Sequence, residues 1–252
     1  MKPLYLFVFF LSILTAKAQD KNQFYALDAN MNQTLLDSSK YILWIHEQDS
    51  ARWQWDYYYT WGTLVKSTNY SDHDGTIKNG RFCIYNTFGN LDSTGVYEYG
   101  KKNGLFLKLA SVTKDSIEMI RQYEYVHDSL VSFTNLLVKK EKHTDSVSNV
   151  EPEFPGGRLE WLSYLSRNLH YPERAQRKQI QGMVRIFFQV DSEGIVKEPF
   201  IFKSAEYSLD QEAIRIIKDS GKWTPGNKDG ISVSSNKIQP VKFTLVSQQI
   251  LD

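Results

Sequence analysis

The sequence has a single cysteine and only seven prolines among its 252 residues. One cysteine cannot form a disulfide within the chain, so the fold must be stabilised by packing. Cys83 lies between Phe82 and Ile84 in a strand-like run, which favours a buried, inert thiol over a reactive one. So few prolines also argue against a long proline-rich spacer.

An excess of either charge is also missing. The chain carries 30 basic and 29 acidic residues, a formal net charge of +1. A balanced charge gives no reason to expect nucleic acid or a charged lipid surface as a partner.

Motifs that mark enzymes are absent as well: the sequence has no H-E-x-x-H zinc motif, no G-x-S-x-G elbow and no phosphate loop. His127 and Asp128 are adjacent, so on a strand they would point to opposite faces and fail as an acid–base pair. Asp191 and Glu193 share one short turn and supply too few ligands for calcium. We therefore expect a non-enzymatic protein with no cofactor and no metal.

Only one apolar run is long enough to be a targeting or membrane segment. It covers residues 4–14 and follows Lys2. An A-x-A pattern at residues 16–18 precedes Gln19, as at a signal-peptidase site. The run is shorter than the roughly 20 residues of a membrane-spanning helix. The sequence predicts a signal peptide over residues 1–18 and no transmembrane helix after cleavage; the alternative is an inner-membrane anchor.

What the sequence does have is aromatic residues, 14% of the total, concentrated in residues 19–142. Residues 58–64 (YYTWGTL) and 85–91 (YNTFGNL) repeat one pattern, and residues 79–82 (NGRF) echo 103–106 (NGLF). Asn-Gly is a strong hairpin signal, so short antiparallel strands joined by turns are predicted. The region resembles MORN-like repeats of exported bacterial proteins, which implies a β-meander acting as a scaffold or docking surface.

After a polar linker at residues 143–150, residues 151–247 alternate between helix and strand signals. Leucines at 159, 162, 165 and 169 have helical spacing, and residues 171–175 predict a second, short helical turn with Pro172 at its start. A later helix is expected to have Ser208 as its N-cap, with Gln211 completing a capping box. Val184, Ile186, Phe188 and Val190 alternate as on one face of a strand, which pairs with a returning strand at residues 195–202 as a β-hairpin. One later strand is predicted at residues 239–245. We predict an α+β fold: a C-terminal two-layer α/β sandwich with a small, mainly antiparallel sheet, preceded by the N-terminal β-meander.

Seven motifs in a fixed order distinguish this second unit from a general α+β domain. They are E-P-E-F-P-G-G at 151–157, Y-P-x-x-A at 171–175, G-x-V at 182–184, V-D-x-x-G at 190–194, L-D-x-E-A at 209–213, W-x-P-G at 223–226 and P-V-x-F at 240–243. Together they resemble the C-terminal domain of the TonB energy transducer.

The resemblance implies binding of a short extended peptide of an outer-membrane TonB-dependent receptor, or of another envelope protein, by addition of a strand beside the last strand. Carried over, the partner-binding residues are Tyr171, Pro172, Val241, Lys242, Phe243, Thr244 and Leu245. The opposing interpretation is that Val241, Phe243 and Leu245 only pack the core. If the edge binds, Val241→Pro should abolish capture.

The chain differs from an energy transducer because a signal peptide and a β-region stand where such a protein has an uncleaved helix and a proline-rich spacer. The expected location is therefore the periplasm, as part of TonB-dependent transmembrane transport. A second hypothesis is a structural or assembly protein of the envelope, in which the same edge strand pairs with a second copy to form a homodimer.

Overall fold

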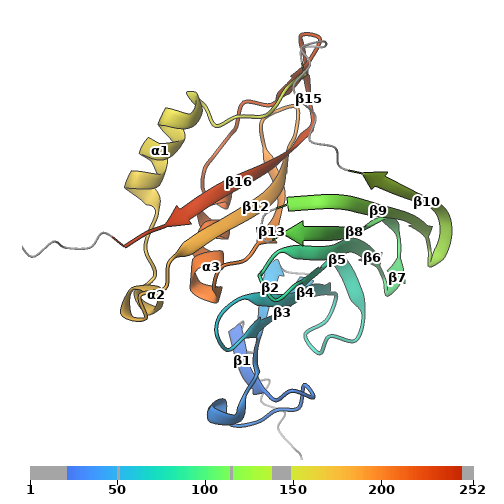
Figure 1. The fold of residues 1–252 in the computed structure, drawn as a ribbon. Helices are drawn as coiled ribbons and strands as arrows, with labels where there is room; N and C mark the ends of the chain where they lie inside the picture. Colours follow the sequence, from blue (N-terminus) through green and yellow to red (C-terminus); the bar gives the residue numbers. More distant parts are fainter. Residues whose placement is uncertain (1–21, 50–51, 114–115, 138–148, 246–252) are drawn as a thin grey trace, which may run out of the picture.

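A computed structural model describes residues 22–49, 52–113, 116–137 and 149–245 (Figure 1). The predicted signal peptide, and most of the predicted linker, lie outside the described residues. Within that part of the chain, none of the helices has the length and apolarity required to cross a membrane.

The N-terminal part is one ten-stranded antiparallel sheet, in which each strand pairs with the next along the chain except that β6 pairs with both β7 and β8. The only helix there is the short η1 (Leu36–Ser38) among the described residues. The strands are β1 (Asn22–Leu27), β2 (Tyr41–Asp49), β3 (Arg52–Tyr59), β4 (Leu64–Tyr70), β5 (Lys78–Tyr85), β6 (Leu91–Glu98), β7 (Lys101–Lys102), β8 (Gly104–Thr113), β9 (Ser116–Val126) and β10 (Ser129–Leu137).

The predicted β-meander is therefore present, although its turns differ from those expected. Gly80 lies inside β5, because the β4–β5 connection is formed earlier, at residues 71–77. There the Asp72 carboxylate accepts hydrogen bonds from the backbone N–H groups of Thr76 and Ile77, which closes the loop without an Asn-Gly pair. The assignment of this meander to MORN-like repeats stays a prediction.

The C-terminal part combines three helices with two three-stranded sheets, so the α+β prediction is confirmed. The larger sheet has the order β13-β12-β16, and the smaller has the order β11-β14-β15. The elements are β11 (Asn149–Val150), α1 (Gly157–Asn168), α2 (Glu173–Arg177), β12 (Gly182–Val190), β13 (Val196–Lys203), α3 (Tyr207–Lys218), β14 (Gly226–Lys228), β15 (Ile231–Val233) and β16 (Ser235–Phe243).

The helix predicted from the leucine spacing is present as α1, but its buried face and the cap of α3 differ from the sequence prediction. Leu159 is 79% exposed and Leu162 is also exposed, because α1 turns Trp161 inward, and the larger aromatic ring buries more apolar area. Helix α3 is capped by Glu206 rather than Ser208: the buried Glu206 carboxylate accepts the backbone N–H groups of Ser208 and Leu209.

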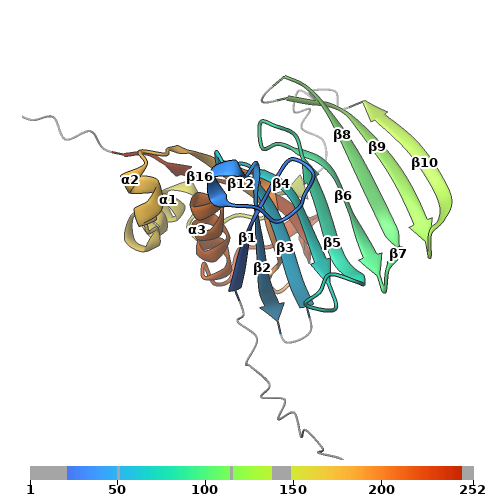
Figure 2. The same cartoon turned by 90° about the horizontal axis from the view of Figure 1, so that it is seen from below.

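One apolar core joins the two parts of the chain. Tyr58, Leu64 and Tyr85 of the meander belong to the same cluster of buried residues as Ile216 of α3 and Val241 of β16. Figure 2 shows α3 beside the β1–β3 end of the meander, whereas β8–β10 extend away from the helices. The meander and the C-terminal part therefore stabilise each other through shared packing.

Candidate functional site

The last strand, β16, is an edge strand. It pairs with β12 along its whole length, from Gly182 opposite Phe243 to Val190 opposite Ser235. In the described part of the chain, no other strand pairs with its outer edge (Figure 1). That edge therefore presents backbone N–H and C=O groups to which another strand can add.

The direction of these groups follows from two observations. In an antiparallel ladder, successive residues direct their N–H and C=O groups alternately to one side and the other. The Leu245 N–H donates to the Gln181 side-chain oxygen at 2.9 Å, on the β12 side, so odd-numbered residues face β12. Pro240 has no N–H and belongs to the opposite, outward set, as expected for proline in an edge strand.

The outward set on β16 is Asn236, Ile238, Pro240 and Lys242. It was only partly predicted, because the sequence interpretation began the strand at residue 239, whereas β16 begins at Ser235. The alternation of exposed and less exposed positions in fact extends back to Ser235, and this is the signal that was missed. The site is therefore longer on its N-terminal side than expected.

The predicted partner-binding residues divide into two groups by side chain. Val241 and Phe243 are 0% and 1% exposed and pack in the core, whereas Lys242 and Thr244 are exposed and Leu245 is half-buried. The core-packing interpretation therefore holds for the Val241 and Phe243 side chains. Of the predicted residues on this strand, Lys242 and Thr244 therefore offer their side chains to a partner, and Val241 and Phe243 do not.

Tyr171 and Pro172 support the strand from beneath. The Tyr171 ring meets the Phe243 ring edge-on, with 5.7 Å between centroids, and its hydroxyl donates to the Ile180 carbonyl at 2.6 Å. Pro172 is the N-cap residue of α2, and its carbonyl accepts the Gln176 N–H. Both residues are half-buried, so they position the end of β16 more than they offer contacts to a partner.

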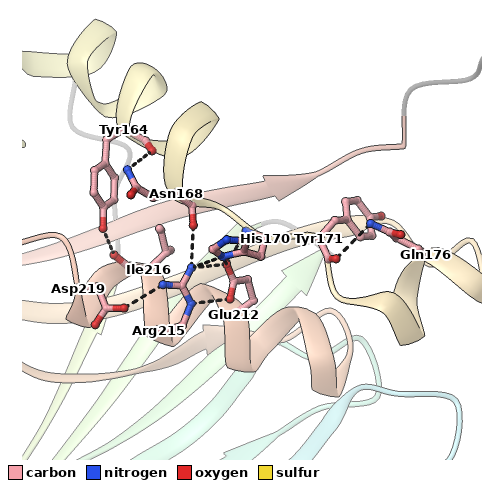
Figure 3. Close-up of polar contacts among 9 residues, drawn as sticks. All are labelled: Tyr164, Asn168, His170, Tyr171, Gln176, Glu212, Arg215, Ile216 and Asp219. Atoms are coloured by element: carbon pink, nitrogen blue, oxygen red, sulfur yellow. Dashed lines mark hydrogen bonds and ion pairs between the residues drawn. The ribbon is translucent and has the colours of Figure 1, made fainter.

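Arg215 of α3 holds the segment that carries Tyr171 (Figure 3). Its guanidinium donates to the Glu212 carboxylate, to Asp219 at 2.9 Å and to the Asn168 carbonyl at 2.7 Å. Glu212 also accepts the His170 backbone N–H at 2.7 Å. The hydrogen bonds to Glu212, followed by the other acidic contacts, raise the pKa of Arg215, so it stays charged and ties α1 to α3.

The opposite edge of the same sheet, on β13, is covered by the meander. Asn90 forms a β-bridge with Lys203, and the Ser204 N–H donates to the Gly89 carbonyl at 2.8 Å. The buried Tyr85 hydroxyl donates to the Ile201 carbonyl at 2.7 Å. The meander thus covers the β13 edge and leaves the β16 edge open.

The repeat detected in the sequence produces this contact. Its two copies form the β3–β4 and β5–β6 turns, and their glycines, Gly62 and Gly89, sit against residues 204–207. The Gly62 carbonyl accepts the Tyr207 N–H at 3.1 Å, just as Gly89 accepts Ser204. A turn glycine without a Cβ atom is needed here, because a Cβ on Gly89 would lie 2.5 Å from the Ser204 carbonyl oxygen.

Ser204 and Asp210 complete the junction. The Ser204 hydroxyl donates to the Asp210 carboxyl at 2.6 Å and accepts the Leu64 N–H at 2.9 Å. Asp210 is fully buried, and this burial raises its pKa to about 8 despite the hydrogen bonds from Ser204 and Ala205 that act in the other direction. This carboxyl links the first turn of α3 to the meander and has a structural role.

The remaining candidate groups have local roles. His127 and Asp128 occupy the β9–β10 turn, where the Asp128 carboxylate accepts the Lys102 N–H at 2.7 Å. Asp191 accepts the N–H groups of Glu193 and Ile195 within its own turn. Across the described residues, no three His, Cys, Asp or Glu side chains gather into a metal-binding group. Cys83 is buried, and burial raises the pKa of its thiol.

Comparison with known protein families identifies one segment. Residues 167–245 match the family described as Gram-negative bacterial TonB protein C-terminal. The match covers less than half of the chain and extends from the end of α1 to just beyond β16. No curated protein and no solved structure matches the chain.

Proposed function

We propose that this protein binds an extended peptide segment of another envelope protein along the outer edge of β16, by β-strand addition, and performs no catalytic step. The partner we assign is an outer-membrane receptor of TonB-dependent transport, and the location is the periplasm. This assignment rests on the family match at residues 167–245, which contains the whole of β16.

The observation that carries the proposal is the asymmetry of the three-stranded sheet. One edge, on β13, is covered by the meander, and the other, on β16, has no strand beside it in the described chain. Its outward groups are the carbonyls of the outward set and the N–H groups of Asn236, Ile238 and Lys242. Backbone pairing to such a row supplies affinity with little dependence on sequence, and nearby side chains supply selectivity.

Selectivity would come from the exposed residues that flank the row. Lys242 supplies a positive charge, and Ile238, four residues earlier on the same face of the strand, is 41% exposed. Pro240 interrupts the row of donors, so a bound strand must leave one of its carbonyls without a partner on β16. The segment bound best would therefore carry an acidic residue near Lys242 and an apolar residue near Ile238.

The orientation of β16 changes which variant tests the proposal. The Val241 N–H faces β12, so Val241→Pro would break the sheet itself and lose capture for the wrong reason. Lys242→Pro removes an outward N–H and leaves the ladder to β12 intact. Lys242→Ala is its matched control, because it removes the same side chain and keeps the N–H.

The experiment is photocrosslinking in intact cells from a reactive amino acid at Asn236, followed by identification of the captured protein. We expect an outer-membrane receptor to be captured, capture to weaken modestly in Lys242→Ala, which loses only the charge, and to fall much further in Lys242→Pro. A reactive group at Lys101, exposed on β7 of the meander, should not capture it.

Capture that survives Lys242→Pro would contradict strand addition. The homodimer alternative predicts a different result: a dimer by light scattering that Lys242→Pro converts to a monomer, with no receptor captured. That outcome would replace the receptor proposal by self-association through the same edge.

A further inference from the structure

A second site lies away from β16, in a cavity of about 430 Å³ between the meander and the C-terminal part. Strands β2 to β6 line one side of it, and β13 and α3 line the other. This volume falls within the range of small-molecule sites, and contacts between two structural parts are a frequent place for them. The proposed strand addition does not use this cavity.

The floor of the cavity is a polar network on β2, β3 and β4. The Gln54 amide nitrogen donates to both oxygens of the Asp56 carboxylate at 2.9 Å and to the Ser67 hydroxyl at 3.0 Å. His46 lies 3.0 Å from the same carboxylate, and its ring stacks on Trp44 with centroids 3.5 Å apart. These side chains are therefore held in place before any ligand arrives.

Asp56 is the buried acidic residue of this floor. Its side chain is 3% exposed, and among the described residues its only ion-pair partner is His46. Burial, and then the charges of Asp210 and Asp56, raise the pKa of Tyr58 on the same side of the cavity. A carboxylate has about four acceptor positions, so a single amide group and one imidazole leave capacity for a further donor. A buried carboxylate with spare acceptor positions favours a cationic, hydrogen-bond-donating group of a ligand.

The rest of the lining differs in character. Ile201 and Ile214, on the roof, supply apolar surface, and three basic side chains lie closer to solvent: Arg52, Arg81 and Lys218. The Arg81 guanidinium lies 4.5 Å from the centre of the Phe200 ring and donates to Glu198 at 2.9 Å, which fixes its position. A ligand with an anionic end and a short apolar body complements these walls.

We propose that this cavity binds a small zwitterion, an amino acid or a short peptide, with its ammonium group on Asp56 and its carboxylate toward Lys218 and Arg81. The pairing of a buried acid with outer bases sets the orientation. The mixed walls accept an apolar side chain between the two charged ends.

The test is isothermal titration of the full chain with glycyl-leucine, N-acetyl-glycyl-leucine and maltose. We expect glycyl-leucine to bind and N-acetylation, which removes the ammonium group and leaves the protein unaltered, to weaken binding about tenfold or more. Asp56→Asn should weaken glycyl-leucine by a similar factor. Asp229→Asn, in an exposed turn outside the cavity, should leave binding unchanged.

Three results would overturn the proposal. Equal affinity for the acetylated peptide would remove the role of Asp56 as the ammonium site. Binding of maltose in place of the peptide would identify a site for neutral polyols. No binding of any probe up to about 10 mM would leave a cavity that holds only water. If Asp56→Asn fails to fold, the comparison of free and acetylated peptide on the natural protein still decides the question.

Discussion

The contact between the meander and the C-terminal part can be measured with a pair of glycine substitutions. Gly89 has a φ of +74° in the β5–β6 turn, and Gly100 has a φ of +86° in the turn after β6. An added Cβ on Gly89 would lie 2.5 Å from the Ser204 carbonyl oxygen, whereas one on Gly100 would have nothing within 4 Å. Gly89→Ala and Gly100→Ala therefore introduce the same backbone strain, but only Gly89→Ala introduces a clash with Ser204.

The expected magnitudes follow from these two terms. Alanine in the left-handed region costs about 1–2 kcal/mol, which is the whole effect at Gly100. At Gly89 the clash with the Ser204 carbonyl also pushes the two residues apart and breaks the hydrogen bond from the Ser204 N–H to the Gly89 carbonyl. A buried group left without its partner costs about 1–3 kcal/mol more. We expect a loss of about 1–2 kcal/mol for Gly100→Ala and of about 2–5 kcal/mol for Gly89→Ala.

Urea unfolding of the two variants and the natural protein, followed by circular dichroism, gives both free energies. Thermal unfolding should place Gly89→Ala below Gly100→Ala by roughly 2–4 °C for each additional kcal/mol. Equal losses in the two variants would refute the reasoning, because they would mean that the β5–β6 turn does not rest on Ser204.

Two further predictions concern the buried groups near the candidate site. Because burial raises the pKa of Asp210 to about 8 from 3.8, the folded state holds a proton that the unfolded chain releases, so stability falls as pH rises from about 4 to 8. Asp210→Asn should remove a slope of at most about 1.4 kcal/mol per pH unit in urea unfolding at several pH values, and an unchanged slope would contradict the buried carboxyl. Phe243→Ala should cost about 3–5 kcal/mol in unfolding free energy, whereas Thr244→Ala, one residue along the same chain, should change it by less than about 0.5 kcal/mol. Similar losses in that pair would mean that the faces of β16 are assigned wrongly.

Local chemistry made much of the fold predictable. Val184, Ile186, Phe188 and Val190 alternate with less buried residues, and this period placed β12 correctly. The helix of residues 207–218 was predicted with its N-cap two residues late, and its apolar face was recognised from the helical spacing of Leu209, Ala213, Ile216 and Ile217. The cap was missed because Ser208 and Glu206 both have suitable side chains. Glu206 is the cap because the fold buries its carboxylate beside Arg174, whose Nε lies 2.9 Å from it.

The candidate site was predictable in type but incompletely in extent. The P-V-x-F motif located the end of β16, and Pro240 alone indicates which residues face outward. Tyr171 was predicted as a contact residue, but its ring packs against Phe243 inside the fold. Side-chain direction at such a position depends on packing with distant segments, which periodicity does not describe.

By itself the sequence determined the elements: antiparallel strands in the first half, the helix and hairpin pattern of the second, and a final alternating strand whose apolar residues must be buried. These follow from short-range periodicity and turn chemistry. Only the tertiary structure decided that the repeated turns at Gly62 and Gly89 rest on residues 204–207, which covers the β13 edge and leaves that of β16 open. The physical reason is that edge pairing and cavity formation depend on contacts between residues more than 100 positions apart, such as Leu64 and Ser204, and no local pattern encodes them.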